Sequence, residues 1–400
     1  RPFEDMRAAL LAAATPLSTV EQVPTAEALG RVLAVDQISS LDVPPLDNSS
    51  MDGYALRCAD VPTAGTRLVV AQRIPAGSVG HTLAPGTAAR IFTGAPIPQG
   101  ADAVVMQELC SLDGDGVLID HLPRPGEWIR RAGEDIPRGA VVLTAGQRLG
   151  PQMLGLAASV GCATLPVFRP LRVALFSTGD ELVMPGEPLP PGAIYNSNRY
   201  VLRGLLEALG CQVSDLGIVP DSLAATRAAL REAAAGNDLI LTSGGVSVGE
   251  EDHVKPAVEA EGRLDLWLVA MKPGKPVAFG RVDSPAGGAD FIGLPGNPVS
   301  SFVTFLMLVR PFILRRMGVE DCLPKGIILS AGFDWPRPDR RREFLRARVG
   351  EAGQVELFPN QGPGVLSSTV WAAGLVDNPA GHAIAQGEPV SFIPYSELLS

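Results

Sequence analysis

Three apolar runs that each end in glycine and polar residues constrain this sequence most. Residues 238–242 read Asp-Leu-Ile-Leu-Thr, like a buried parallel strand, and pass directly into a Ser-Gly-Gly turn at 243–245. Residues 172–182 and 291–300 repeat the pattern, with Ser-Thr-Gly-Asp-Glu and Pro-Gly-Asn-Pro at their strand ends. Because ligands bind beyond the carboxyl ends of strands in an open α/β sheet, these ends are expected to meet at one crevice. Glycine backbone can approach an anion closely, so the crevice is predicted to hold a phosphate-bearing ligand and a divalent cation.

Composition and charge exclude several classes of protein. A chain of 400 residues exceeds one core of ordinary size, so about two to four domains are expected. Hydrophobic residues make up 46% and charged residues 19%, proportions typical of a globular protein. The net charge of −10 argues against non-specific binding to nucleic acid.

Cysteine, histidine and hydropathy patterns predict a cytoplasmic protein that uses no zinc. The five cysteines are scattered, as is typical of free thiols in a reducing cytoplasm. The four histidines lack zinc-like spacing, so any metal is expected to be a hard cation with oxygen ligands. No apolar run approaches the roughly 20 residues of a membrane span. Residues 1–17 predict an amphipathic helix with acids rather than a signal peptide, so no membrane partner is expected.

The order of helix-like and strand-like segments divides the chain into four parts. Residues 1–45 and 141–169 are expected to form a helical connector, into which a β domain of residues 46–140 is inserted. Residues 170–318 alternate strands and helices, which predicts an α/β domain with a mostly parallel sheet covered on both faces. Residues 319–400 are predicted to form a compact β barrel or sandwich.

The α/β domain is expected to contain six strands and three helices. The predicted strands are Val173–Ser177, Gln212–Val219, Leu239–Ser243, Trp267–Met271, Pro276–Arg281 and Phe291–Leu294. The predicted helices are Arg199–Leu209, Ser222–Ala235 and Val299–Met317. The last helix follows a Gly-Asn-Pro turn, so its N-terminal N–H groups and positive dipole end are expected to face the crevice and suit an anion.

Carboxylates and lysines follow the predicted strand ends. The candidate acids are Asp180, Glu181, Asp221, Asp252, Asp52 and Asp135. Clustered carboxylates repel one another unless a cation bridges them, and Mg²⁺ typically bridges one or two carboxylates to substrate phosphates. The turn at 271–276 carries Lys272 and Lys275, whose compact charges suit phosphate or an oxyanion. This combination favours attack at a phosphoryl or phosphoanhydride group, and no P-loop, dinucleotide fingerprint or nucleophile triad competes with it.

Seven multi-residue motifs are spread over nearly the whole chain. They are PPLDNSSMDGYAL (44–56), RIFTGAPIPQGADAVVMQE (90–108), GEDIPRG (133–139), STGDEL (177–182), TSGGVSVGEEDHVK (242–255), MKPGKP (271–276) and GLPGNPVSS (293–301). In these motifs and in their order, the sequence resembles the molybdopterin molybdenumtransferase family, which includes MoeA and the E domain of gephyrin.

The resemblance implies a four-part fold and a reaction. The fold is an elongated connector, an inserted β domain, a three-layer molybdopterin-binding α/β domain and a C-terminal β barrel. The implied assembly is a homodimer whose active site lies between the α/β domain of one subunit and the β domain of the other. The implied reaction is Mg²⁺-dependent insertion of molybdate into adenylylated molybdopterin, with hydrolysis of the phosphoanhydride and release of AMP. A molybdopterin adenylyltransferase would act upstream and supply the substrate.

The same resemblance implies roles for individual residues. The implied substrate-binding residues are Thr93, Ser177, Thr178, Gly179, Asp180, Ser243, Gly244, Gly245, Ser247, Gly249, Pro295, Gly296, Asn297 and Pro298. The implied catalytic residues are Asp52, Asp135, Glu181, Asp221, Asp252 and Lys272. Glu181 and Asp252 would hold Mg²⁺. Molybdate would contact Lys272, Lys275, Ser300, Arg342, Arg346, Ser367 and Ser368.

Two departures and two alternatives accompany this interpretation. Leu268 stands where some family members have a lysine, and the 362–368 stretch ends in Ala372-Ala373 rather than Ala-Asn. One alternative is a molybdopterin adenylyltransferase, which the additional domains argue against. The other is a non-catalytic cofactor-binding scaffold, which would not need an acidic loop together with both lysines.

Overall fold

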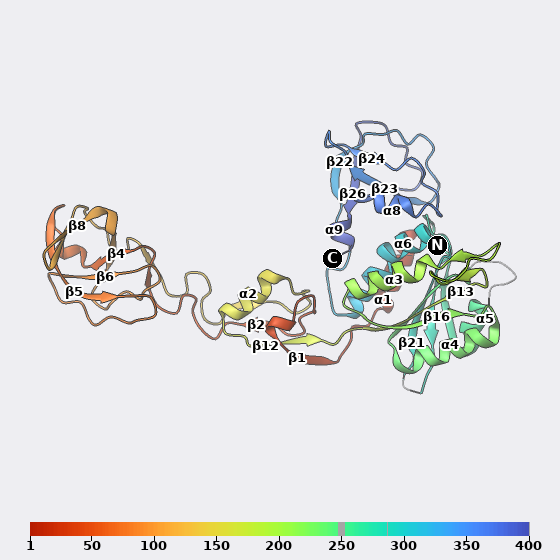
Figure 1. Ribbon diagram of the computed structural model, residues 1–400, viewed down its shortest axis with the longest axis horizontal. Helices are drawn as coiled ribbons and strands as arrows, with labels where there is room; N and C mark the ends of the chain where they lie inside the picture. Colours follow the sequence, from red (N-terminus) through yellow and green to blue (C-terminus); the bar gives the residue numbers. More distant parts are fainter. Residues whose placement is uncertain (247–252, 286, 400) are drawn as a thin grey trace.

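The computed structural model describes residues 1–246, 253–285 and 287–399, so Ser247, Gly249 and Asp252, all expected in the site, lie outside the described residues. The molecule is elongated (Figure 1). The inserted β domain lies at one end and a narrow connector occupies the middle. The α/β domain, with the C-terminal β domain beside it, forms the other end.

The inserted domain is built on a six-stranded sheet in the order β7-β4-β6-β5-β9-β8. Its strands are β4 (Gly53–Leu56), β5 (Thr66–Ile74), β6 (Thr87–Ile91), β7 (Ala103–Met106), β8 (Cys110–Asp113) and β9 (Gly116–Ile119). Side chains alternate between two cores, so that Tyr54 and Leu56 enter one cluster and Ala55 the other. A short pair, β3 (Asn48–Ser49) with β10 (Ile129–Arg130), lies where the chain enters and leaves the domain.

The connector contains more strand than was predicted. β1 (Val20–Pro24) pairs with β12 (Thr164–Phe168), and β2 (Gln37–Ile38) pairs with β11 (Val141–Leu143). Helical structure is confined to α2 (Pro151–Ser159) and the 3₁₀ turn η1 (Thr25–Glu27). Within residues 1–45, the prediction of helix is confirmed at α1 (Phe3–Ala13) and in part at η1, and it is wrong at β1 and β2. These short strands are fixed by partners more than a hundred residues away, which local periodicity does not report.

The N-terminal helix α1 (Phe3–Ala13) belongs to the α/β core rather than to the connector. Its stripe of Phe3, Met6 and Leu10 is fully buried in one hydrophobic cluster with strands and helices of the α/β domain. An amphipathic helix packs wherever its apolar face finds the largest complementary surface, and here that surface is the main sheet layer.

The α/β domain has three layers around a six-stranded sheet in the order β16-β13-β17-β21-β20-β18. β13 (Arg172–Thr178), β16 (Gln212–Val219), β17 (Leu239–Ser243) and β21 (Ala289–Leu294) are parallel. β20 (Ala278–Val282) pairs antiparallel with both β21 and β18 (Gly262–Trp267), so β18 runs in the same direction as the four parallel strands. One face carries α1, α3 (Ser197–Ala208) and the long helix α6-η4-α7, and the other carries α4 (Leu223–Gly236) and α5 (Val254–Glu261).

Two local predictions in this domain are wrong. The expected strand Trp267–Met271 is replaced by β18, which ends at Trp267, and by the two-residue strand β19 (Met271–Lys272), which pairs with the C-terminal sheet. Helix α5 was not predicted. The turn between β18 and β19 includes Leu268 at φ 68°, a conformation that breaks a continuous strand.

The long helix consists of α6 (Pro298–Thr304), the π-helical segment η4 (Phe305–Val309) and α7 (Arg310–Arg316). Its 19 residues are long and apolar enough to cross a membrane on those grounds alone, but 89% of the apolar window is buried inside the protein. It is the central core helix of this domain. The predicted helix Val299–Met317 is thus confirmed to within one residue at each end.

The C-terminal domain is a mainly antiparallel sheet that curls back on itself. Its strands follow the order β19-β23-β25-β26-β22, and β24 pairs with β23 on the edge opposite β25. They are β22 (Ile327–Ser330), β23 (Arg342–Val349), β24 (Val355–Leu357), β25 (Gly374–Asn378) and β26 (Pro389–Pro394). A bridge between Ala331 and Val355 joins the β22 end to β24. The short helices α8 (Ser367–Trp371) and α9 (Tyr395–Leu398) complete the domain.

Candidate functional site

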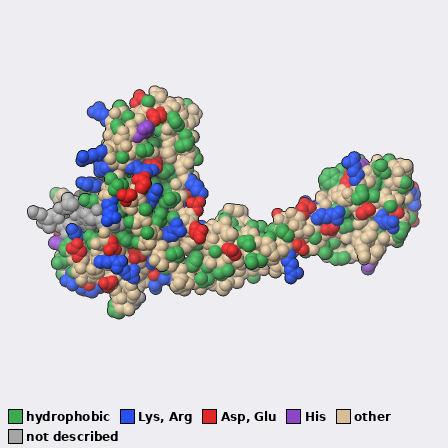
Figure 2. Space-filling model, turned by 180° about the vertical axis from the view of Figure 1, so that it is seen from behind, with side chains coloured by type: hydrophobic (Ala, Val, Ile, Leu, Met, Phe, Trp, Pro, Cys, Tyr) green, Lys and Arg blue, Asp and Glu red, His purple; other side chains and the backbone are tan. Residues whose placement is uncertain are grey.

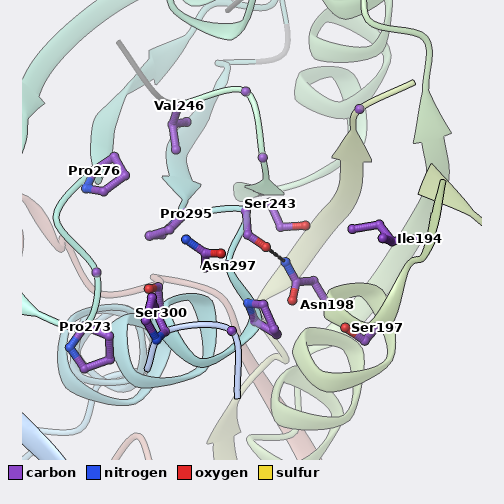
Figure 3. A pocket seen from close by; sticks show the side chains of 18 of the residues that line it. Ile194, Ser197, Asn198, Ser243, Val246, Pro273, Pro276, Pro295, Asn297 and Ser300 are labelled. Carbon is purple, nitrogen blue, oxygen red and sulfur yellow. Dashed lines mark hydrogen bonds between the residues drawn. The ribbon is translucent and has the colours of Figure 1, made fainter. Parts of the chain in front are cut away.

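A pocket of about 1060 Å³ opens at the carboxyl ends of β13, β17 and β21, where the sequence predicts a crevice. Figure 3 shows Ile194 and Ser197 on one side, with Pro273 and Pro276 across from them. All three strand-end turns contribute, together with the lysine turn and a loop of the C-terminal domain. The lining residues are Thr178, Gly179, Glu181, Leu182, Ile194, Tyr195, Asn196, Ser197, Asn198, Asp221, Ser243, Gly244, Gly245, Val246, Lys272, Pro273, Gly274, Lys275, Pro276, Pro295, Gly296, Asn297, Pro298, Ser300, Arg341, Gln361, Pro363, Gly364 and Leu366.

The Gly-Gly turn after β17 can exist only with glycine. Gly244 and Gly245 have φ of +86° and +65°, and a Cβ on Gly244 would lie 2.6 Å from the Thr178 carbonyl oxygen. This close approach brings the ends of β13 and β17 together. The Ser177 and Ser243 hydroxyls, 3.1 Å apart and buried, form a hydrogen bond between the same two strands. Ser177 is thus placed behind the pocket wall, whereas Ser243 reaches the lining.

One side of the pocket is acidic. Glu181 and Asp221 line it, and the Thr178 hydroxyl, buried among them, has no hydrogen-bond partner within the described residues. Asp180 lies outside the lining and accepts a hydrogen bond from the Asp221 N–H at 3.1 Å. Carboxylate and hydroxyl oxygens are ligands that Mg²⁺ accepts, so this side fits a hard cation.

The number of carboxylates decides whether the protein alone could enclose a cation. In the part of the chain that the structure describes, no three His, Cys, Asp or Glu side chains are grouped to hold a metal ion. A closed protein cage is therefore absent from the described residues. The arrangement instead matches Mg²⁺ that retains water and is shared between one or two carboxylates and substrate phosphates.

The opposite side carries the two predicted lysines, which differ in their surroundings. The Lys272 ammonium lies 3.3 Å from a Glu343 oxygen and 3.5 Å from an Asp339 oxygen, both from the C-terminal domain. The exposed Lys275 side chain has no carboxylate partner among the described residues. Figure 2 shows Lys and Arg side chains gathered along the edge of the molecule formed by the α/β domain and the C-terminal domain. An incoming oxyanion therefore meets Lys275 as an uncompensated charge.

The start of α6 faces the same pocket, as the sequence predicts. Asn297 is at the N-cap position, Pro298 has no N–H, and the Val299 N–H donates to the Pro363 carbonyl at 3.0 Å. Few free donors remain in this first turn, so the anion-binding capacity of the helix end is smaller than predicted. The Ser300 hydroxyl is buried at the lining and adds a side-chain donor there.

Four other residues expected to contact molybdate lie outside the lining, namely Arg342, Arg346, Ser367 and Ser368. Arg342 donates to both Asp377 oxygens at 2.6 and 2.7 Å and pairs with Glu4. Arg346 is 1% exposed and donates to the Ser368 hydroxyl at 3.2 Å, and burial lowers its pKa to about 10. Ser367 begins α8 beside them. The arginine that reaches the pocket is Arg341.

The residues expected from the inserted domain lie in a part of the chain separate from the pocket, since that domain occupies the other end of the molecule (Figure 1). Asp52 accepts hydrogen bonds from the Thr93 N–H and hydroxyl, both at 2.8 Å, and these bonds lower the pKa of the Asp52 carboxyl. Asp135 lies in the turn that follows β10, where its N–H donates to the Val43 carbonyl. Within one chain, these residues and the α/β pocket are not brought together.

Several lining residues were not predicted as site residues. Tyr195 and Ile194 form β15 (Ile194–Tyr195), which pairs with β14 (Leu182–Val183) at the mouth of the pocket. Asn198 donates to the Gly296 carbonyl at 2.8 Å and so ties α3 to the loop before α6. Asn196 caps α3, because its side chain accepts a hydrogen bond from the Arg199 N–H. Three polar residues directly after a strand were the signal in the sequence that could have identified this part of the site.

Comparison with known protein families gives matches along the chain. The MoeA N-terminal region (domain I and II) matches residues 1–161, a probable molybdopterin binding domain matches residues 174–315, and the MoeA C-terminal region (domain IV) matches residues 329–395. A molybdopterin molybdenumtransferase of Haemophilus influenzae is 41% identical over 384 residues, which is 93% of each chain. Molybdopterin molybdenumtransferase 2 of Mycobacterium tuberculosis is 41% identical over 374 residues, 89% of this chain and 90% of the relative.

A solved structure shares the fold over its full length. The molybdopterin biosynthesis MoeA protein of Pyrococcus horikoshii superposes with a TM-score of 0.82 at 31% identity and covers 99% of both chains. A second structure, of a molybdopterin biosynthesis MoeA protein from Pyrococcus horikoshii OT3, gives a TM-score of 0.86 at 29% identity and covers 98% of this chain. The multidomain α/β arrangement with mixed sheets is therefore common to both.

Proposed function

The chain belongs to the MoeA family of molybdopterin molybdenumtransferases, which insert molybdenum into molybdopterin, and on that premise we propose a specific reaction for its pocket. The substrates are adenylylated molybdopterin and molybdate. Water attacks one phosphorus of the phosphoanhydride, the P–O bond to the bridging oxygen breaks, and AMP leaves. The two dithiolene sulfurs bind the molybdenum while their two protons leave with one molybdate oxygen as water, so the oxidation state of the metal does not change. The observation that carries this proposal is a pocket with an acidic wall facing an uncompensated lysine.

The acidic wall would hold Mg²⁺. Glu181 and the Thr178 hydroxyl would contribute oxygen ligands, and Asp252, outside the described residues, is the second expected carboxylate. Bound there, Mg²⁺ would supply charge neutralisation between phosphate oxygens. Asp221 lies on the same wall and would orient the attacking water. The backbone at Gly244 and Gly245 would approach the phosphates closely.

The basic wall would receive molybdate. Lys275 and Ser300 would contact its oxygens directly, and Lys272 would add a third contact while it remains anchored by carboxylates. Lysine suits this purpose because its compact ammonium has three rotatable donors. Arg341, which lines the pocket, replaces Arg342 and Arg346 in our assignment of the arginine that faces the anion.

We also propose a homodimer in which the Asp52–Thr93 group of one subunit completes the pocket of the other. The distance between the two groups within one chain, visible in Figure 1, supports this arrangement. A two-fold axis would give two equivalent shared sites.

AMP release by the purified protein tests the reaction. Adenylylated molybdopterin and Mg²⁺ are supplied with and without molybdate, and AMP is quantified over time. Release that depends on molybdate is expected. Tight binding of substrate without release would instead favour a scaffold, and ATP-dependent adenylylation of molybdopterin would favour the preceding enzyme of the pathway.

A further inference from the structure

A completely buried carboxylate lies behind the basic wall of the pocket. The Glu343 side chain, on β23, is 0% exposed. One of its oxygens lies 3.3 Å from the Lys272 ammonium. The other accepts hydrogen bonds from the Trp335 indole N–H at 2.8 Å and from the Asn378 amide at 3.3 Å. A buried charge is costly unless it is paired and hydrogen-bonded, and Glu343 meets both conditions through residues of three different segments.

The backbone fixes the same contact. β19 and β23 pair in parallel, with Lys272 directly opposite Glu343. β19 thus joins the C-terminal sheet although it belongs to the turn that lines the pocket of the α/β domain. The two-residue pairing positions the Lys272 backbone, and the carboxylate positions the end of its side chain.

A second carboxylate further restricts the orientation of the Lys272 ammonium. Asp339 lies 3.5 Å from it and is itself held by Arg341 through two bonds of 3.0 and 2.9 Å. The hydrogen bonds from Arg341, with Lys272 nearby, lower the pKa of Asp339 well below its usual value. An ammonium has three N–H donors, and two of them face these carboxylates. The Lys272 side chain remains 39% exposed, so its third donor is available on the pocket side.

We propose that Glu343 is a positioning residue that holds the Lys272 ammonium so that its third N–H points to the molybdate site. This inference rests on the proposed function. It assigns to the C-terminal domain a role in oxyanion affinity that passes through Lys272 and needs no direct contact with the substrate. Held in advance, the lysine loses little side-chain freedom when the oxyanion binds.

The test is Glu343→Gln, which keeps shape and the hydrogen bonds to Trp335 and Asn378 but removes the charge. The KM for molybdate in the AMP-release assay is expected to rise about tenfold with kcat at saturating molybdate unchanged, because ground-state and transition-state binding fall together. The matched control is Glu356→Gln, which removes a carboxylate of the same domain at the same 3.3 Å from an arginine, Arg348, on the surface. Its KM should equal that of the wild type.

A double-mutant cycle separates positioning from general damage. Lys272→Met and the double variant Lys272→Met/Glu343→Gln should have the same molybdate KM, because Glu343 acts only through the lysine. If Glu343→Gln folds poorly, Trp335→Phe removes one hydrogen bond to the carboxylate and should raise the KM in the same direction by a smaller factor.

Three results would overturn the inference. The first is additive effects of Lys272→Met and Glu343→Gln on the molybdate KM in the double-mutant cycle. The second is a lower molybdate KM in Glu343→Gln, which would mean that the carboxylate competes with the oxyanion for the lysine. The third is a change of molybdate KM in Glu356→Gln equal to that in Glu343→Gln. The failure of the proposed function is distinguishable, since wild-type AMP release would then be independent of molybdate. Molybdate-dependent release in the wild type with an unchanged KM in Glu343→Gln would refute only the role of Glu343.

Discussion

Asp238 connects the connector to the sheet that carries the pocket, and its removal should destabilise the protein measurably. The residue immediately precedes β17. Its carboxylate accepts two bonds from Arg169, at 2.7 and 2.8 Å, and one from the Arg172 N–H at 2.8 Å. The Asp238 side chain is 10% exposed. A bidentate pair with a backbone bond in this partly buried setting is stronger than an ordinary surface ion pair.

The magnitude follows from the pKa. Burial raises the pKa of Asp238, but the hydrogen bonds from Arg169 and Arg172 outweigh it and lower the pKa to about 2 from the ordinary 3.8. Because the pKa is depressed in the folded protein, the stabilisation is fully present above the ordinary pKa and is lost as pH falls through about 2. It amounts to about 2 kcal/mol at neutral pH after a reduction for solvent screening around the half-exposed Arg172.

Urea unfolding of Asp238→Asn at pH 7 measures this contribution. The variant should lose about 2 kcal/mol of unfolding free energy, and the difference from the wild type should shrink below about pH 4. Asp321→Asn is the control, since Asp321 pairs with Lys325 where both side chains are about 70% exposed, and it should cost less than about 0.5 kcal/mol. A loss in Asp238→Asn no larger than in this control would refute the reasoning.

Two further predictions concern the pocket. Asp52→Asn and Lys275→Met homodimers should each be inactive, but mixing the two variants should recover about a quarter of wild-type AMP release. Half of the dimers would then be mixed, and each mixed dimer would have one intact site out of two. No recovery despite demonstrated subunit exchange would argue against a shared site. In EDTA, Glu181→Gln should bind AMP several-fold more tightly than the wild type, because one repulsive charge is removed. Addition of Mg²⁺ should increase the AMP affinity of this variant less than that of the wild type. Calorimetry with and without Mg²⁺ measures both, and an unchanged Mg²⁺ response would exclude Glu181 from the cation site.

The parts of the site that were predictable are those encoded in contiguous residues. β13, β17 and β21 are apolar runs that end in glycine, and their parallel alignment alone brings Thr178, Ser243 and Gly296 to one edge of the sheet. No contact between distant segments had to be known. The same holds for α6, whose start was evident from the preceding turn.

The parts that were not predictable depend on pairing between distant segments. Arg341 lies in the bend before β23, donates to Asp339 and reaches the pocket. Arg342 is the first residue of β23 and donates to Asp377 on the neighbouring strand β25, a pairing between distant segments that the sequence does not report. Glu343 was overlooked for the same reason. It has no motif of its own, and its importance arises from standing opposite Lys272 in that register.

Under the proposed function, the charges of the pocket give both a cation and Lys275 a distinct part in binding. Every proposed ligand is an anion, yet the carboxylates of Glu181 and Asp221 line the pocket. Lys272 and Arg341 can donate hydrogen bonds to an oxyanion but add little net positive charge, because Glu343 and Asp339 pair with them. Phosphates would therefore be repelled from the acidic wall unless a divalent cation lay between, at a cost of several kcal/mol for charges about 4 Å apart. Molybdate, in turn, would be drawn to Lys275, whose charge no described carboxylate compensates, and the two reacting groups would thus be held at opposite walls of one cavity.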